Sequence, residues 1–157
     1  MKDLVEKIVN KLANENKTIS FAESCTGGRV ASEFTAISGV SSVLNGSCVT
    51  YSNNIKSLWL GVKESTLIDF GAVSRECVEE MLIGIRDKAF ADCTIAVSGI
   101  AGPKGGTEFK PVGTVYIGVL TPNGSFVKLY NFNGSREDIQ KQATQKAIEN
   151  MAKELNL

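Results

Sequence analysis

The first segment of this sequence with candidate catalytic residues contains a serine followed closely by two glycines. Residues 23–28 read Glu-Ser-Cys-Thr-Gly-Gly and follow a short β-rich segment at 17–22. Helical spacing resumes from Arg29, so a strand is expected to turn into a helix here. A hydroxyl at such a turn lies beside unpaired N–H groups that can stabilise an oxyanion. From this stretch alone, helix capping by Ser24 or Thr26 is the simpler explanation.

The absence of histidine restricts how such a serine could be activated. The chain has 157 residues and no histidine, which excludes a Ser-His-Asp triad, a Cys-His pair and histidine-ligated metals. Cys25 competes as a nucleophile, but without a histidine base it is better explained as a small buried apolar group. The base for a catalytic serine would have to be a lysine, a tyrosine or a carboxylate.

A tyrosine at the end of the second expected strand is followed closely by a lysine. Tyr51 and Lys56 are five residues apart, and no Gly-x-Gly-x-x-Gly motif accompanies them, so a dinucleotide-dependent dehydrogenase is not indicated. The lysine can act as a base if burial or nearby positive charge lowers its pKa. Taken alone, the segment is better explained by a solvated surface lysine beside a packed tyrosine.

A glycine-rich stretch follows a later strand. Residues 98–106 read Ser-Gly-Ile-Ala-Gly-Pro-Lys-Gly-Gly, and Lys-Pro-Val-Gly follows at 110–113. Closely spaced glycines can turn several N–H groups toward a phosphate, and Lys104, Lys110 or Arg136 could add positive charge. The stretch does not match a P-loop, and a mobile surface loop explains it equally well.

The overall composition excludes several classes of function. Lys and Arg number 17, as do Asp and Glu, so no net charge attracts nucleic acid or an anionic membrane. No apolar run approaches the roughly 18 residues of a membrane-spanning helix, and no signal peptide is evident. The four cysteines are irregularly spaced without a Cys-x-x-Cys pair. We therefore expect a cytoplasmic protein with reduced thiols, no metal and no cofactor.

Periodicity predicts the elements that must position these residues. Helices are expected over 3–15, 29–37, 53–60, 64–70 and 74–89, and from Ser135 onward, where Asp138 completes a capping-box-like start. Strands are expected over 17–22, 46–51, 93–98, 113–120 and 125–132, the last two as a hairpin. This order predicts an α/β sandwich with a mixed sheet, as a single domain over residues 1–157.

The order of the motifs and their residue sequences together resemble those of one known family. They read Ala-Glu-Ser-Cys-Thr-Gly-Gly at 22–28, Thr-Tyr-Ser-Asn at 50–53 with Lys56, Gly-Ala-Val-Ser at 71–74, Ser-Gly-Ile-Ala-Gly-Pro at 98–103 with Gly105 and Gly106, and Lys-Pro-Val-Gly-Thr-Val at 110–115. From residue 4 to residue 155, the chain is similar to the C-terminal domain of the competence-damage-inducible protein CinA. Ser98 stands where many members have threonine, and Gln140 where some have a second arginine.

The resemblance implies a fold, an activity and a site. It implies a three-layer α/β/α fold, commonly a homo-oligomer, that deamidates nicotinamide mononucleotide to nicotinic acid mononucleotide and ammonia. It places the catalytic groups at Ser24, Tyr51 and Lys56. Together with the motifs above, it leads us to expect a substrate site formed by Cys25, Thr26, Gly27, Gly28, Ser98, Gly99, Gly102, Lys104, Gly105, Gly106, Lys110 and Arg136. A non-catalytic pyridine-nucleotide-binding module, or an amidase for a different small amide, remains an alternative.

Overall fold

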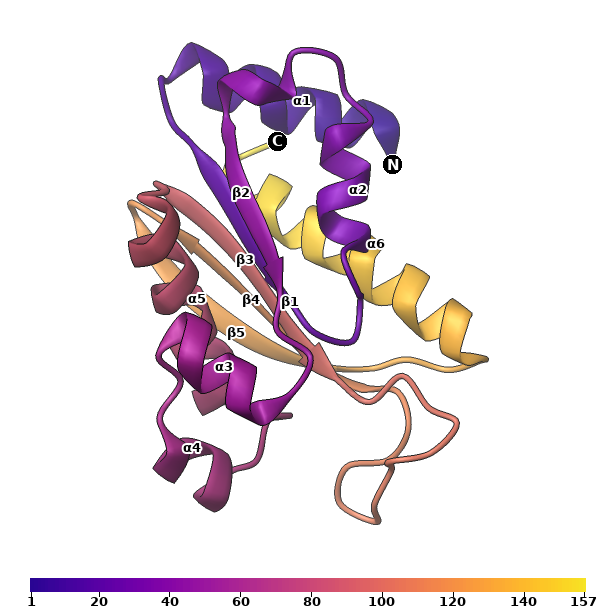
Figure 1. The fold of residues 1–157 in the computed structure, drawn as a ribbon. Coiled ribbons are helices and arrows are strands. Elements are labelled where there is room, and N and C mark those ends of the chain that lie inside the picture. Colours follow the sequence, from indigo (N-terminus) through magenta and orange to yellow (C-terminus); the bar gives the residue numbers. More distant parts are fainter.

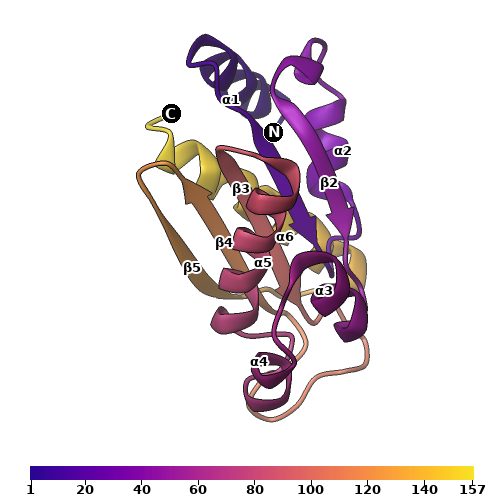
Figure 2. The ribbon, with the colours of Figure 1, turned by 60° about the vertical axis from the view of Figure 1, so that its left-hand side comes forward.

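Five strands form one sheet that carries helices on both faces (Figures 1 and 2). The computed structural model describes residues 1–157. The strands are β1 (Ile19–Glu23), β2 (Leu44–Val49), β3 (Cys93–Gly99), β4 (Thr114–Thr121) and β5 (Gly124–Asn131). The helices are α1 (Lys2–Asn14), α2 (Arg29–Thr35), α3 (Asn53–Leu60), α4 (Glu64–Asp69), α5 (Arg75–Ala89) and α6 (Arg136–Glu154), with a short 3-10 turn η1 at Val40–Ser42.

The sheet is half parallel and half antiparallel. Its strand order is β2-β1-β3-β4-β5, with β1 parallel to both β2 and β3. The β3–β4 and β4–β5 pairs are antiparallel, and the second pair is the expected hairpin. All residues of β1 are buried, as a central strand covered on both faces requires. The predicted α/β fold with a mixed sheet is confirmed.

The helices divide into two layers, and each layer encloses its own apolar core. In Figures 1 and 2, α1, α2 and α6 lie on one side of the sheet, and α3, α4 and α5 lie on the other. The first core is the larger and includes Leu12, Phe21, Phe34, Ile117 and Ile148. The second includes Leu60, Val78, Met81, Leu82 and Ala96. The fold is therefore the three-layer arrangement that the resemblance implied.

Local signals explain where the helices begin. The Ser74 hydroxyl accepts a hydrogen bond from Cys77 N at the start of α5, and Ser135 and Asp138 form a reciprocal capping box at the start of α6. Both starts were predicted. At α3, the Ser52 hydroxyl accepts from Ile55 N in the same way. None of the helices combines the length and the apolar character needed to cross a lipid bilayer.

The second strand ends earlier than its sequence pattern predicts. It was expected to reach Tyr51, but β2 ends at Val49. Thr50 N still donates to Glu23 O at 2.8 Å, whereas Thr50 O accepts from the Lys56 side chain at 2.8 Å. The lysine thus turns the chain into α3, and Tyr51 lies in the connection between β2 and α3.

Candidate active site

The residues with candidate chemistry meet at the carboxyl ends of the parallel strands. Ser24 follows β1 directly, Lys56 lies in α3 just after β2, and Ser98 stands near the end of β3. Because β1, β2 and β3 are mutually parallel, these ends lie at one edge of the sheet. Open α/β sheets commonly bind their ligands at this edge.

Lys56 is buried beside Ser24. Its side chain is 1% exposed, and Nζ lies 3.2 Å from Ser24 Oγ. The same nitrogen lies 2.8 Å from Thr50 O and 3.4 Å from Tyr51 O, so all its partners are uncharged oxygens. Burial disfavours the ammonium form and lowers the pKa of Lys56 below its ordinary value of 10.5. A solvated surface lysine, the alternative left open by the sequence, is not what the structure contains.

The partners of Lys56 can accommodate a neutral amine as well as an ammonium. Such an amine has two N–H groups and one lone pair. The carbonyl oxygens of Thr50 and Tyr51 can only accept hydrogen bonds, so they engage the two N–H groups. Nζ also donates to Ser24 Oγ, and when Lys56 is neutral the serine hydroxyl can instead donate to its lone pair. This arrangement lets Lys56 take the serine proton.

Cys25 is held in an unreactive form. The side chain is 4% exposed, and burial raises the pKa of its thiol to about 12. A thiol in this state supplies almost no thiolate near neutral pH, and thiolate is the reactive form. The structure therefore favours Ser24 over its neighbour as the nucleophile.

Glu23 changes the expected set of oxyanion donors. Its carboxylate accepts hydrogen bonds from the N–H groups of Gly28, Val30 and Ala31, and Gly27 N donates to Ser24 O. The N–H groups of Gly27 and Gly28, two residues expected in the substrate site, are therefore engaged elsewhere. The N–H groups of Cys25 and Thr26 make no hydrogen bond within the chain and are the remaining donors beside Ser24.

Tyr51 contacts an arginine rather than the lysine. Its oxygen accepts from Arg136 Nη2 at 2.5 Å, and Arg136 Nη1 donates to Gly102 O at 2.7 Å. Only the backbone oxygen of Tyr51 reaches Lys56. The hydroxyl of Tyr51, which the resemblance places among the catalytic groups, therefore does not contact Lys56. Tyr51 instead helps to hold Arg136 against the glycine-rich loop.

The glycine-rich loop leaves several backbone donors free. The N–H groups of Ala101, Gly102 and residues 104–106 make no hydrogen bond within the chain. Gly102 has a φ of +81°, and a Cβ there would lie 2.5 Å from Val112 Cγ1, so the loop's path requires glycine. These packing constraints account for some of the glycines, while the free donors suit an anion.

These groups line one cavity of about 250 Å³. Its lining includes three basic side chains, Lys56, Lys104 and Arg136, and no carboxylate. It brings together ten of the expected residues, namely Ser24, Cys25, Tyr51, Lys56, Ser98, Gly99, Gly102, Lys104, Gly105 and Arg136. A cavity with this charge suits an anionic ligand.

Five expected residues do not line the cavity. The Lys110 ammonium donates to Phe70 O at 2.7 Å instead, and the Thr26 hydroxyl donates to Glu23. The others are Gly27, Gly28 and Gly106. Sequence reasoning in turn missed lining residues at Asn53, Ala72, Val73, Ile100 and Ala101. Ala72 O accepts from the Ser98 hydroxyl at 2.8 Å, and the 71–74 motif was the one available signal for it.

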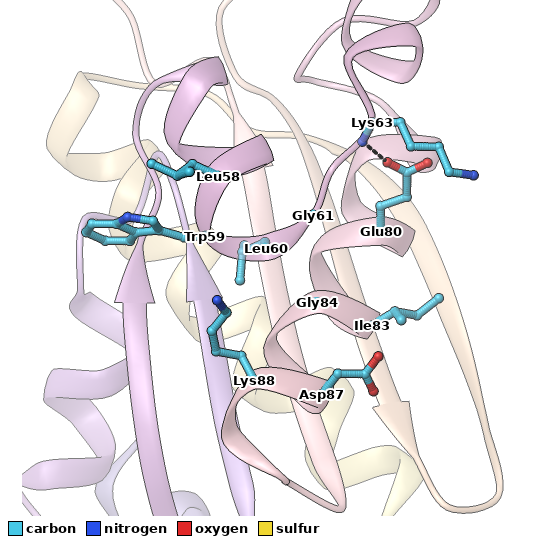
Figure 3. Close-up of a pocket in the computed structure, with 10 residues that line it drawn as sticks. All are labelled: Leu58, Trp59, Leu60, Gly61, Lys63, Glu80, Ile83, Gly84, Asp87 and Lys88. Atoms are coloured by element: carbon cyan, nitrogen blue, oxygen red, sulfur yellow. Dashed lines mark hydrogen bonds between the residues drawn. The ribbon is translucent and has the colours of Figure 1, made fainter.

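A larger hollow lies on the outer side of α3 (Figure 3). It measures about 690 Å³ and runs between α3 and α5, with Trp59, Ile83 and Lys88 in its lining. Of its two acidic residues, Glu80 and Asp87, Glu80 accepts from Lys63 N at 2.7 Å and from the Thr66 hydroxyl. The lining contains no serine, cysteine or threonine, and the Ser24–Lys56 pair lines the smaller cavity instead.

The fold and the site define an α/β protein with a buried serine–lysine pair at the carboxyl edge of its parallel strands. Residues 1–155 match the model of the CinA C-terminal domain. The chain belongs to the CinA family. The family resemblance found in its motifs is thereby confirmed.

Individual relatives agree with this assignment. A CinA-like protein of Thermotoga neapolitana is 48% identical over 152 residues, which are 96% of this chain and 37% of that protein. One of Fervidobacterium nodosum is 50% identical over 143 residues, 91% of this chain and 35% of that protein. The chain thus spans little more than a third of these curated relatives.

Solved structures share the whole fold. The competence damage-inducible protein A (ComA) from Klebsiella pneumoniae has a TM-score of 0.95 at 34% identity, covering 99% of this chain and 96% of that one. The competence/damage inducible protein CihA from Agrobacterium tumefaciens has a TM-score of 0.94 at 37% identity, covering 99% and 95%.

Proposed function

We propose that this chain hydrolyses the carboxamide of nicotinamide mononucleotide to give nicotinic acid mononucleotide and ammonia. The observation that carries the proposal is the buried Lys56 Nζ at 3.2 Å from Ser24 Oγ, in a cavity lined by cations and no carboxylate. The identity of the substrate rests on the resemblance of the motifs to the CinA family. The cavity supports an anionic substrate more generally.

In the proposed acylation step, Ser24 Oγ attacks the carboxamide carbon while neutral Lys56 takes the hydroxyl proton. The N–H groups of Cys25 and Thr26 stabilise the oxyanion. The carbon–nitrogen bond then breaks, and Lys56 returns the proton to the leaving ammonia. Water attacks the resulting ester by the reverse transfers and releases the acid. The positive pyridinium ring disfavours a charged Lys56 and so assists the first transfer.

In this proposal the 5′-phosphate binds at the other end of the cavity. Arg136 and Lys104 supply positive charge there, and the loop N–H groups of Ala101, Gly102 and residues 104–106 supply donors. This separation of roles predicts that the phosphate contributes to affinity, whereas the serine–lysine pair determines the chemistry.

The test is ammonia release from three substrates, nicotinamide mononucleotide, nicotinamide riboside and nicotinamide. We expect turnover of the mononucleotide with kcat/KM roughly 100-fold or more above that of the riboside, because a phosphate makes several charge-assisted hydrogen bonds. Equal turnover of all three would indicate an amidase for a different small amide. Binding of the mononucleotide without any ammonia release would indicate a non-catalytic module.

A further inference from the structure

Glu23 is a fully buried carboxylate placed directly before the proposed nucleophile. It is 0% exposed and forms no ion pair with a lysine or arginine. Its partners are the Thr26 hydroxyl at 2.7 Å, Gly28 N at 3.0 Å, Val30 N at 3.1 Å and Ala31 N at 2.9 Å. A buried charge is tolerated only when its hydrogen bonds are satisfied, and here the turn at 24–28 and the start of α2 satisfy them.

The backbone of Glu23 is linked to Lys56 through Thr50. Glu23 O accepts from Thr50 N at 2.8 Å, and Thr50 O accepts from Lys56 Nζ at 2.8 Å. The side chain of Glu23 therefore holds the turn that carries Ser24, while its carbonyl holds the segment that receives Lys56. Ser24 and Lys56, which form the 3.2 Å contact, are therefore both linked to Glu23.

We infer that Glu23 is a positioning residue for Ser24 and Lys56. Its carboxylate fixes the turn at 24–28 against α2, and it removes the Gly28, Val30 and Ala31 donors from the site. The N–H groups of Cys25 and Thr26 are then the ones beside Ser24 that have no acceptor within the chain. This inference rests on the proposed role of Ser24 as the nucleophile, but not on the identity of the substrate.

The principal variant is Glu23→Gln, which keeps the shape of the side chain. The amide nitrogen cannot accept a hydrogen bond, so part of the donor set loses its partner and the turn relaxes. We expect kcat to fall roughly 10- to 100-fold while KM for nicotinamide mononucleotide changes less than about threefold, because misplacement of a reacting group weakens chemistry more than binding. The rate at which a fluorophosphonate modifies Ser24, followed by intact mass, should fall by the same factor. In that reaction Oγ bonds to phosphorus, fluoride leaves and Lys56 takes the proton.

A matched control lies on the opposite side of α3. Glu80 also accepts hydrogen bonds from a backbone N–H and a threonine hydroxyl, but it lines the outer hollow. Glu80→Gln should lower the midpoint of thermal unfolding while kcat and the labelling rate stay at the wild-type values. Thr26→Val removes one donor to Glu23 and leaves the carboxylate, so its labelling rate should fall less, by roughly 3- to 10-fold.

Each outcome separates the two proposals. Wild-type labelling without ammonia release would reject the substrate and leave the role of Glu23 standing. A wild-type rate of labelling in folded Glu23→Gln would overturn that role. If circular dichroism shows that Glu23→Gln does not fold, the labelling rate of Thr26→Val is the test instead. A wild-type labelling rate in Thr26→Val would then overturn the inference. No labelling of the wild-type chain would reject both proposals.

Discussion

A lysine can replace histidine as the base for a serine when its environment removes its charge. Lys56 is surrounded by uncharged oxygens and the sheet edge, and its burial lowers its pKa. The cost of burying the ammonium and the larger fraction of neutral amine at working pH have the same origin. This environment matters because the chain has no imidazole with a pKa near neutrality.

Substitutions at three adjacent functional groups should separate their roles. Ser24→Ala and Lys56→Ala should each reduce kcat for ammonia release by roughly a thousandfold or more, because each removes a group that takes part in bond formation. Cys25→Ala should keep most of the activity, because its thiol has a pKa of about 12 and supplies almost no thiolate. Loss of activity in Cys25→Ala together with survival of Ser24→Ala would move the nucleophile to the neighbouring residue.

The buried lysine should also leave a signature in the stability of the fold. Since the folded-state pKa of Lys56 lies below the ordinary 10.5, the unfolded chain holds a proton that the folded chain lacks between these two values. The free energy of unfolding contributed by Lys56 therefore rises with pH across this window. Lys56→Met lacks this contribution, so any stability it gains should shrink as the pH approaches 10.5.

Urea unfolding of the wild-type chain and Lys56→Met at neutral pH and near pH 10 measures this difference. A difference in unfolding free energy that stays constant between the two pH values would mean that Lys56 keeps its ordinary pKa. Such a result would remove the physical basis for its role as a base.

At the scale of elements, the position of α3 depends on its contact with α5. Gly84 lies in α5 where a Cβ would stand 2.0 Å from Leu60 O, the last residue of α3. The two helices approach so closely that only glycine fits. Because α3 carries Lys56, this contact also fixes the distance between the lysine and the serine.

Gly84→Ala should therefore disturb both stability and activity. We expect the free energy of unfolding to fall by about 1–3 kcal/mol, as for other overpacked sites, and kcat to fall with it as α3 shifts. Gly46→Ala is the matched control, because Gly46 lies in β2 and a Cβ added there would have no atom within 4 Å. Urea unfolding and ammonia release measure both effects. Equal free energies of unfolding for the two variants would mean that α3 shifts to accommodate the added methyl group without loss of stability.

Element types were largely predictable from sequence because periodicity and capping signals agree with the final packing. The helices begin at Ser74 and Ser135 as expected, and the hairpin joins β4 and β5. The end of β2 was not predictable, because it depends on Lys56 taking the carbonyl of Thr50. A lysine folding back to end a strand has no signature in the local sequence.

The candidate site was predictable in its members more than in their roles. Ser24 and Lys56 were expected together, but the burial of the lysine could not be read from a residue type that is usually exposed. Glu23 was missed because its carboxylate reaches donors up to eight residues away, at Ala31. Lys110 was expected at the ligand, yet it contacts Phe70, which belongs to a distant segment.

At the scale of the whole molecule, the two halves of the sheet contribute differently. The parallel strands β1, β2 and β3 end at the cavity, while the antiparallel strand β4 continues the sheet and β5 forms its far edge. Arg136 at the start of α6 reaches across to Tyr51 and Gly102, so segments that are 85 and 34 residues away in the chain enclose one cavity with it.

This enclosure predicts a specific effect on affinity. Arg136→Gln should raise KM for nicotinamide mononucleotide roughly 10- to 100-fold, because it removes a charge-assisted contact to the proposed phosphate. Tyr51→Phe should have a smaller effect in the same direction, since it releases Arg136 without removing its charge. The control is nicotinamide riboside, for which neither substitution should change KM. Similar losses with both substrates would place Arg136 away from the phosphate.

The hollow between α3 and α5 has one practical consequence. The sole tryptophan of the sequence, Trp59, lies in that hollow, 46% exposed, on the same short helix as Lys56. Indole emission is sensitive to the polarity around the ring, and no second tryptophan adds background. Intrinsic fluorescence therefore offers a label-free optical signal for any displacement of α3 when a ligand enters on its other side.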